Sequence, residues 1–333
     1  MKSLFLWILL LLVVAVAAIA GGAWWYANKP LSMDAPVIEF TVQRGSNMRQ
    51  AARTIAAAGV DVNPEALYWI ARLEGKAERI VAGSYEIPEG VTAREVIARL
   101  YEGDVARAEL LLVEGWNFRQ VRAAIESHPY LLKDTAGMSD GEILQGIGAT
   151  ESHPEGLFFP DTYVFDRHSS GLGVLRSAYQ AMQQRLGRAW EMRDPDVPLS
   201  SPYEALILAS IIEKETGQSE ERGLVASVFA NRLRIGMRLQ TDPTVIYGFG
   251  EDFEGRLRRH HLQTDHEYNT YIRAGLPPTP IAMPGWDSML AAVRPLESDF
   301  LYFVARGDGT SHFSRNLGEH NRAVNRYQRG RGS

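Results

Sequence analysis

The sequence predicts an α+β fold, with a single transmembrane helix at the N-terminus, a small α+β module and a larger mixed α+β domain. An uncharged apolar run over residues 4–26 indicates the helix. Further along, short segments of alternating polar and apolar residues predict strands, and apolar residues at helical spacing between them predict helices. The chain has 333 residues, 45% of them hydrophobic and 23% charged, which fits roughly two globular domains.

Composition excludes several classes of protein. The formal net charge of -5 argues against a broad nucleic-acid surface, which needs clustered lysine and arginine. No cysteine is present, so a disulfide framework, a thiolate zinc site and a cysteine nucleophile are all excluded. Because of the net negative charge, we expect no nucleic acid among the partners.

The apolar run of residues 4–26 has roughly the length that a helix needs to cross a bilayer. Lys2 precedes it, which favours cytoplasmic residues 1–3, and the aromatic residues 24–26 close it like an interfacial belt. Small residues within 15–20 resemble signal-peptidase sites, so a cleaved signal peptide is the alternative. Because the apolar run continues beyond these sites, we expect a retained single-pass anchor with the rest of the chain outside the cytoplasm.

A linker over residues 27–36 leads to a first compact module over 37–105. The expected elements are strands at 38–42 and 82–87 and helices that begin after Ser46, Pro64 and Thr92, with Ser46 and Thr92 as caps. This pattern resembles the LysM-like module of membrane-anchored wall enzymes. Glycan binding and a plain spacer role both remain open for it.

Residues 106–330 are expected to form one larger domain. Its expected elements are a strand from 106, a helix opened by Asn117, a long helix over 171–190, a central helix opened by Ser201 and Pro202, and a strand-like segment at 245–247. The central helix is apolar on all sides, so it should lie inside the domain.

The central helix ends in two carboxylates, Glu213 and Glu215. Two positions correspond to roughly 200° around a helix, so the two acids cannot both face one cleft. Glu215 continues the buried stripe of Leu208 and Ile211, and it lies where the helix meets Thr216, at an expected rim. From spacing alone, both acids can equally be solvated last-turn residues or partners of nearby cations.

Several long motifs follow one another in the second half of the chain. They are PEGLFFPDTY from Pro154, ASIIEKETG ending at Gly217, ERGLVASVFANRLRIGMRLQTDPTVIYG from Glu221, YNTYIRAGLPPTPIAMPG from Tyr268 and LYFVARGDGTSHFSRNLGEHN from Leu301. This succession resembles the YceG-like (MltG) endolytic murein transglycosylases nearly end to end. Departures are small: Thr279 stands where the family usually has glycine, and Met283 where a polar residue is common.

The resemblance implies cleavage of the β-1,4 bond between N-acetylmuramic acid and N-acetylglucosamine in nascent peptidoglycan, with a 1,6-anhydro ring at the product end. It also implies that Glu215, the second glutamate of EKET, is the essential acid. One carboxyl group suffices if it first protonates the glycosidic oxygen and then accepts the proton of the sugar's C6 hydroxyl. A glycan hydrolase with Glu213 or Asp242 as a second carboxylate is one alternative. A wall-binding scaffold without turnover is another.

The expected sugar contacts come from polar residues that follow the central helix. They are Gln240, Thr241, Asp242, Asn269, Tyr271 and, on the helix itself, Glu213. For Asp242 an Asx turn before proline, and for Tyr271 core packing, are the alternative roles. His260 and His261 are adjacent, so we expect their side chains to diverge, and no metal-binding spacing is present. The sequence therefore predicts no metal and no cofactor.

The anchor and the resemblance together predict where the protein acts and with what. We expect an inner-membrane protein whose catalytic domain lies in the periplasm and cuts glycan strands internally near the membrane, where they emerge, and so ends their elongation. The resemblance implies peptidoglycan polymerases (penicillin-binding proteins) as partners, although no interface is visible in the sequence.

Overall fold

The computed structural model describes residues 2–215 and 218–329, so the predicted domain end at 330 and the rim at Thr216 lie outside the described residues. The chain separates into two compact units. Unit 1 contains Met1–Ala108 with Val164–Ser169, and unit 2 contains Glu109–Tyr163 with Ser170–Ser333. The predicted α+β class and the N-terminal apolar helix are both confirmed.

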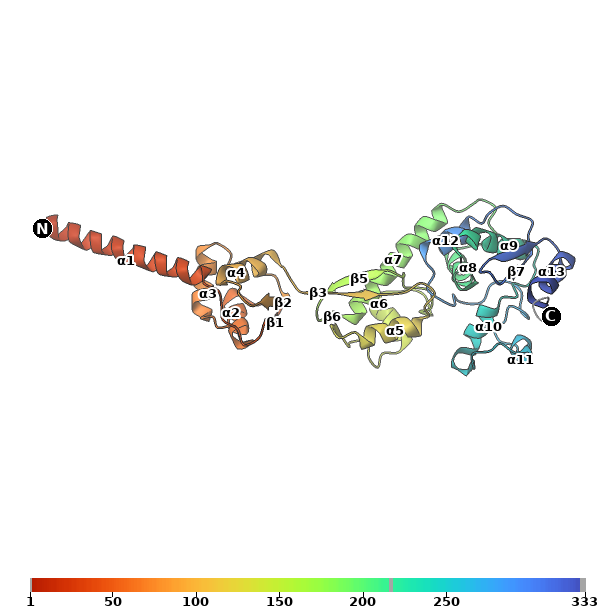
Figure 1. Cartoon of the computed structure of the whole chain (residues 1–333), viewed down its shortest axis with the longest axis horizontal. Helices are drawn as coiled ribbons and strands as arrows, with labels where there is room; N and C mark the ends of the chain where they lie inside the picture. The colour runs from red at the N-terminus through yellow and green to blue at the C-terminus, as the bar shows by residue number, and fades with distance from the viewer. Residues whose placement is uncertain (1, 216–217, 330–333) are drawn as a thin grey trace. The chain divides into compact units, whose positions relative to one another are not determined.

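Unit 1 begins with helix α1 (Lys2–Asn28). Its segment Phe5–Asn28 has a mean hydropathy of 2.7, and no residue of its most apolar stretch of 18 residues is buried. Within the part of the chain that the structure describes, it is the one helix apolar and long enough to cross a membrane. The C-terminal end of α1 packs against helices α3 and α4 of the same unit (Figure 1). Ala27 and Leu31 are buried there, so the segment expected as a linker contributes to the core of unit 1.

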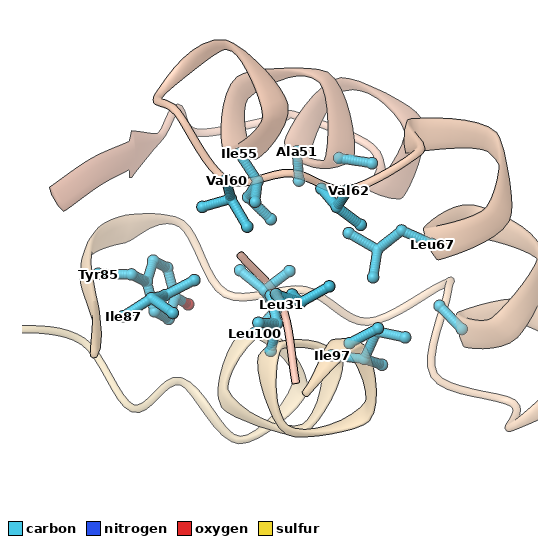
Figure 2. Packing of buried hydrophobic residues seen from close by; sticks show 14 of the residues in the cluster. Leu31, Ala51, Ile55, Val60, Val62, Leu67, Tyr85, Ile87, Ile97 and Leu100 are labelled. Atoms are coloured by element: carbon cyan, nitrogen blue, oxygen red, sulfur yellow. The ribbon is translucent and has the colours of Figure 1, made fainter. Parts of the chain in front are cut away.

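The body of unit 1 is a two-stranded antiparallel sheet with three helices. The elements are β1 (Val37–Val42), α2 (Met48–Ala57), α3 (Pro64–Leu73), β2 (Gly83–Pro88) and α4 (Ala93–Glu102). The core lies between these helices and the sheet, where residues such as Ile55, Leu67, Ile97 and Leu100 point toward one another (Figure 2). The strands and helices predicted for this segment are therefore present. The likeness to a LysM module stays a prediction.

The caps of unit 1 correct one detail of the sequence analysis. Asn47, not Ser46, caps helix α2: its side chain accepts a hydrogen bond from the Gln50 amide, and the Gln50 side chain accepts one from the Asn47 amide. A capping box needs its partner three residues into the helix, and glutamine stands three residues after Asn47. Thr92 caps α4 as predicted, with Glu95 completing the box.

The rest of the chain consists of helices and short two-stranded sheets. From Arg107 onward they are β3 (Arg107–Leu111), α5 (Phe118–Ser127), β4 (Leu131–Leu132), α6 (Asp140–Ile147), β5 (Thr162–Asp166), β6 (Ser169–Ser170), α7 (Gly171–Glu191), α8 (Pro202–Glu215), η1 (Ser219–Glu221), α9 (Arg222–Arg234), α10 (Asp242–Phe249), η2 (Gly250–Asp252), α11 (Arg259–Gln263), α12 (Trp286–Val293), β7 (Tyr302–Ala305), β8 (Ser311–Ser314), α13 (Leu317–Val324) and η3 (Asn325–Arg329). The strands pair as β3-β5, β4-β6 and β7-β8.

Helix α8 is the centre of unit 2, as its uninterrupted apolar sequence predicts. Every residue from Ala205 to Ile212 is buried. Helices α7, α9, α10 and α12 all pack against it (Figure 1). Because packing surrounds the apolar part of α8 on all sides, its acidic C-terminal turn is held in a fixed place within the unit.

Candidate active site

Glu215 ends helix α8, and its carboxyl group lies half-buried against the start of helix α10. The Thr241 hydroxyl, which is almost fully buried, donates a short hydrogen bond to Oε1 of Glu215. Burial raises the pKa of the Glu215 carboxyl, and the hydrogen bond from Thr241 partly opposes this rise. The carboxyl can therefore keep a proton at higher pH than an exposed glutamate, which is what a general acid requires.

The charges around Glu215 act in opposite directions. Asp242 raises the pKa of the Glu215 carboxyl and Arg232 lowers it. The Arg232 side chain is buried, and its guanidinium donates to the backbone oxygens of Leu239 at 2.6 Å and Leu301 at 2.7 Å. Arg232 thus fixes the segment that leads to Thr241 while contributing a positive charge near the acid.

Glu213 faces a different part of the structure, as the helical spacing predicts. Its Oε2 accepts a hydrogen bond from the Gly285 amide at 3.0 Å. The pKa of the Glu114 carboxyl is raised, first by the burial of Glu114 itself and second by the negative charge of Glu213. Lys214 and Arg222, the cations considered as alternative partners of the two glutamates, bind the Gly115 oxygen and Asp287.

The turn from Gln240 to Asp242 is held by the 269–271 segment. Gln240 has a left-handed backbone with φ of 49°, and its amide donates to the Thr270 oxygen at 3.1 Å. The Thr241 amide donates to the Thr270 hydroxyl at 3.1 Å, and the Asp242 carboxylate accepts from the Tyr271 hydroxyl at 2.5 Å. The side chains of Gln240 and Asp242 are exposed. The structure therefore brings Gln240, Thr241, Asp242 and Tyr271 together beside Glu215.

Helix α10 (Asp242–Phe249) corrects the prediction for residues 245–247, which were expected to be strand-like. Thr241 has an extended backbone and precedes the helix, and Pro243 lies within the first turn. Proline is favoured there because the first turn of a helix leaves its amide groups without intrahelical partners. The helix start at Thr241 and Pro243 therefore outweighs the strand preference of the β-branched residues at 245 and 246.

Asn269 is completely buried and supports the turn. Its side-chain amide donates to three backbone oxygens, those of His261, Leu262 and Thr264, and its side-chain oxygen accepts from the Tyr271 amide at 3.0 Å. These bonds occupy the amide group within the fold. Sugar contact by Asn269 stays a prediction.

Glu155 is a buried acid that the sequence analysis did not single out. Its side chain is 3% exposed, and burial raises its pKa to about 7. Its carboxyl group accepts from the Phe118 amide, at 3.0 and 3.2 Å to the two oxygens, and from the Tyr247 hydroxyl at 3.1 Å. The signal in the sequence was a glutamate inside the aromatic stretch PEGLFFP, a context in which a carboxylate has little access to water.

Glu155 lines a cavity of about 770 Å³ in unit 2. The lining residues are Gly115, Asn117, Arg119, Gln120, His153, Glu155, Lys214, Pro243, Ile246, Tyr247, Gly250, Glu267, Tyr268 and Ile281. Lys214 directly precedes Glu215 on helix α8, and Pro243 follows the Thr241–Asp242 turn. The cavity therefore adjoins the two segments that hold Glu215, although Glu215 does not itself line it.

The two adjacent histidines, 260 and 261, differ from expectation in geometry. Their ring centroids lie 3.9 Å apart, so the side chains do not diverge. Both belong to the short helix α11, where His261 is buried against Phe249. Within residues 2–215 and 218–329, no group of three or more histidine, aspartate or glutamate side chains is arranged to hold a metal ion.

The geometry defines a class of site: a half-buried carboxyl group with a raised pKa at the end of a buried helix, next to a cavity with polar and aromatic walls. The profile of the YceG-like family matches residues 40–326 of this chain. The chain therefore belongs to the YceG-like family, and the resemblance and the enzyme class predicted from the sequence, a lytic transglycosylase, are confirmed at the level of the family.

Individual relatives agree with this assignment. A protein of Bacillus subtilis (strain 168) named endolytic murein transglycosylase is 31% identical over 330 residues, which is 92% of this chain and 90% of the relative. A protein of Streptococcus pneumoniae with the same name is 24% identical over 317 residues, 85% of this chain and 57% of the relative. The solved structure of a YceG-like protein from Listeria monocytogenes has a TM-score of 0.54 and 30% identity, and covers 86% of this chain and 98% of that one.

Proposed function

We propose that this protein is a peptidoglycan lytic transglycosylase that cuts the β-1,4 bond between N-acetylmuramic acid and N-acetylglucosamine within nascent glycan strands. The position of Glu215 carries the proposal. Its carboxyl group is fixed by Thr241 and has a raised pKa because of burial. The names of the relatives, endolytic murein transglycosylases, support peptidoglycan as the substrate.

The proposed reaction uses the Glu215 carboxyl group twice. Its protonated form donates to the glycosidic oxygen, and the bond from that oxygen to the anomeric carbon of N-acetylmuramic acid breaks. The C6 hydroxyl of the same sugar then bonds to the anomeric carbon, and the Glu215 carboxylate accepts the hydroxyl proton. The products are a free 4-hydroxyl on N-acetylglucosamine and a 1,6-anhydro ring, and the carboxyl group is again protonated.

Substitution of Glu215 by glutamine tests this proposal. The full-length protein in detergent is incubated with uncrosslinked glycan, and the products are identified by mass spectrometry. Glu215→Gln should keep the fold and lose cleavage by at least about a hundredfold, since general acid–base catalysis contributes roughly that much or more. A matched control is Glu204→Gln at the other end of α8, where the carboxylate accepts from the Ser200 amide at 2.6 Å. Retained cleavage in Glu215→Gln refutes the assignment, and products with reducing ends from the wild type indicate a hydrolase.

We further propose that α1 stays in the membrane as a single-pass anchor, with both units in the periplasm. This topology restricts cleavage to strands near their site of synthesis and so favours a role in ending strand elongation, with penicillin-binding proteins as partners. The uncharged helix Phe5–Asn28 supports the anchor. Mass spectrometry of the membrane-bound protein decides between an intact N-terminus and one cleaved after residues 15–20.

The LysM-like role of unit 1 is also a proposal. A cavity of about 460 Å³ lies in this unit and is lined by Ser46, Asn47, Met48, Arg49, Tyr68, Arg72, Ala77, Glu78 and Ile80. The guanidinium of Arg49 lies 4.1 Å from the centroid of the Tyr68 ring. Polar groups beside an aromatic ring suit a glycan, and loss of glycan binding in Tyr68→Ala with retained unfolding temperature would support this role.

A further inference from the structure

The cavity that Glu155 lines shares two structural elements with the acid Glu215. Helix α8 contributes Lys214 to the cavity and Glu215 to the acid site. Helix α10 contributes Tyr247 to the cavity, and Thr241, which precedes α10, binds Glu215. A ligand that fills the cavity is therefore held by the same two helices that position the acid.

The carboxyl group of Glu155 keeps room for a further hydrogen bond. Its neighbours are the amides of Phe118 and Gly156 and the hydroxyl of Tyr247, one donor each. A carboxylate offers about four acceptor sites, and the Phe118 amide is shared between the two oxygens, so the groups of the fold leave at most one site open. Because Glu155 lines the cavity, a bound molecule can supply the missing donor.

The walls of the cavity combine ring faces with neutral polar groups. The rings of Tyr247 and Tyr268 meet edge to face, with centroids 4.9 Å apart. Amides are supplied by Asn117 and Gln120. Apolar walls with a few fixed polar groups are typical of small-molecule sites. A sugar ring matches such walls, since its C–H faces can pack on aromatic rings while its hydroxyl and acetamido groups bind the polar side chains.

The charges around the cavity favour a neutral ligand over an acidic peptide. The guanidinium of Arg119 is paired with Glu251, and the Lys214 ammonium donates to the Gly115 oxygen at 3.2 Å. Glu155 and Glu267 contribute acidic groups to the same lining. Glu251 thus neutralises Arg119, and the Glu155 and Glu267 carboxyl groups offset the charge that Lys214 keeps, so the lining has no excess of positive charge to attract an anion.

We propose that this cavity is a saccharide subsite that takes an N-acetylhexosamine unit next to the bond to be cut, with the side chains of Glu155 and Tyr247 as its polar floor. The proposal rests on the function proposed above and adds the residues that hold the strand. The volume of about 770 Å³ lies within the usual range of small-molecule sites, about 300 to 1,000 Å³. The pKa of Glu155, raised to about 7 by burial, supports the role because the carboxyl group can donate as well as accept near neutral pH.

The test compares Tyr247→Phe and Glu155→Gln with the matched control Tyr163→Phe. Tyr163 is a half-buried tyrosine whose hydroxyl donates to the Phe159 oxygen at 2.7 Å, and it does not line the cavity. Both cavity variants keep the side-chain shape, and thermal unfolding of each shows whether it folds. The full-length variants in detergent are assayed for KM and kcat on uncrosslinked glycan.

In the same experiment, the Glu215→Gln background is titrated with a neutral tetrasaccharide of β-1,4-linked N-acetylglucosamine. The expected result is a roughly fivefold to tenfold rise in KM and in the dissociation constant for Tyr247→Phe and Glu155→Gln, the usual effect of one lost hydrogen bond. Changes no larger than those of Tyr163→Phe overturn the proposal, as does binding of free stem peptide in place of the tetrasaccharide. If binding depends on Tyr247 but the wild type yields no anhydro product, the subsite stands and the proposed reaction fails.

Discussion

Replacement of Glu155 by glutamine removes a carboxyl group whose ionisation opposes folding. Burial raises its pKa from 4.5 to about 7 in the folded protein, whereas in the unfolded chain it is expected to ionise near 4.5. Below pH 4.5 both states are protonated and the group has no effect on the pH dependence. Between pH 4.5 and about 7 the unfolded chain releases the proton first, so the free energy of unfolding of the wild type falls as pH rises.

The size of this loss follows from the two pKa values. Each pKa unit corresponds to about 1.4 kcal/mol, so a rise from 4.5 to about 7 corresponds to about 3 kcal/mol at pH above 7. Glu155→Gln cannot ionise and avoids this loss. The difference in free energy of unfolding between Glu155→Gln and the wild type should therefore increase by about 3 kcal/mol from pH 4.5 to pH 8. Other titrating groups are common to both proteins and cancel in the difference.

Thermal unfolding of both full-length proteins in detergent across this pH range measures the effect. For a unit of this size, about 3 kcal/mol corresponds to a relative gain for Glu155→Gln of roughly 6 to 12 °C in Tm. Parallel curves for the two proteins would refute the reasoning, because they would show that Glu155 ionises alike in the folded and unfolded states. A gap that narrows with rising pH would show a lowered pKa instead.

Two further substitutions test the role of Glu215 and the packing of Gly156 against Pro280. Thr241→Val removes the hydrogen bond that lowers the pKa of Glu215, so the alkaline limb of the kcat–pH profile should move up by about one pH unit. Thr241→Ser keeps the hydroxyl group and should leave the limb in place. An unmoved limb in Thr241→Val argues against Glu215 as the acid. Gly156→Ala, at φ of 79° and with a Cβ 2.4 Å from the Pro280 Cβ, should lower the free energy of unfolding by roughly 2 to 5 kcal/mol, measured by denaturant titration. Gly137→Ala has a similar φ of 80° but open space, so it should show the backbone strain alone; equal losses in the two variants would contradict the predicted clash with Pro280.

Much of the fold could be predicted from local patterns. The apolar helix at the N-terminus, the helix opened by Asn117 and the long helix α7 are all present, because each has a strong start signal or a sustained period. The strand predicted for residues 245–247 was wrong because a β-branched run is ambiguous between strand and helix. Thr241 and Pro243, which start helix α10, determine the helical conformation there. The segment 27–36 looked like a tether because its burial depends on contacts distant in sequence, such as the hydrogen bond that the Leu31 amide donates to the Val91 oxygen at 2.8 Å.

The candidate site was predictable where helical spacing decides direction. Glu213 and Glu215 bind different segments, Gly285 and Thr241, as a separation of roughly 200° requires. Glu155 could not be found in this way, because its burial arises in a loop where no period relates sequence to orientation. Its role depends on Tyr247, 92 residues away in the chain, and only the fold brings the two together.

Helix α10 and the residue before it connect Glu215 to the cavity that Glu155 lines. The residue before it, Thr241, binds the acid Glu215, and Tyr247 within it binds Glu155 at the cavity. Six residues of helix advance roughly 9 Å, so the Cα atoms of Thr241 and Tyr247 are separated by about that much along one rigid element. A glycan strand held at Glu155 would therefore meet the acid at a fixed distance along its length. The choice of bond would then follow from the length of α10 as much as from the chemistry of Glu215.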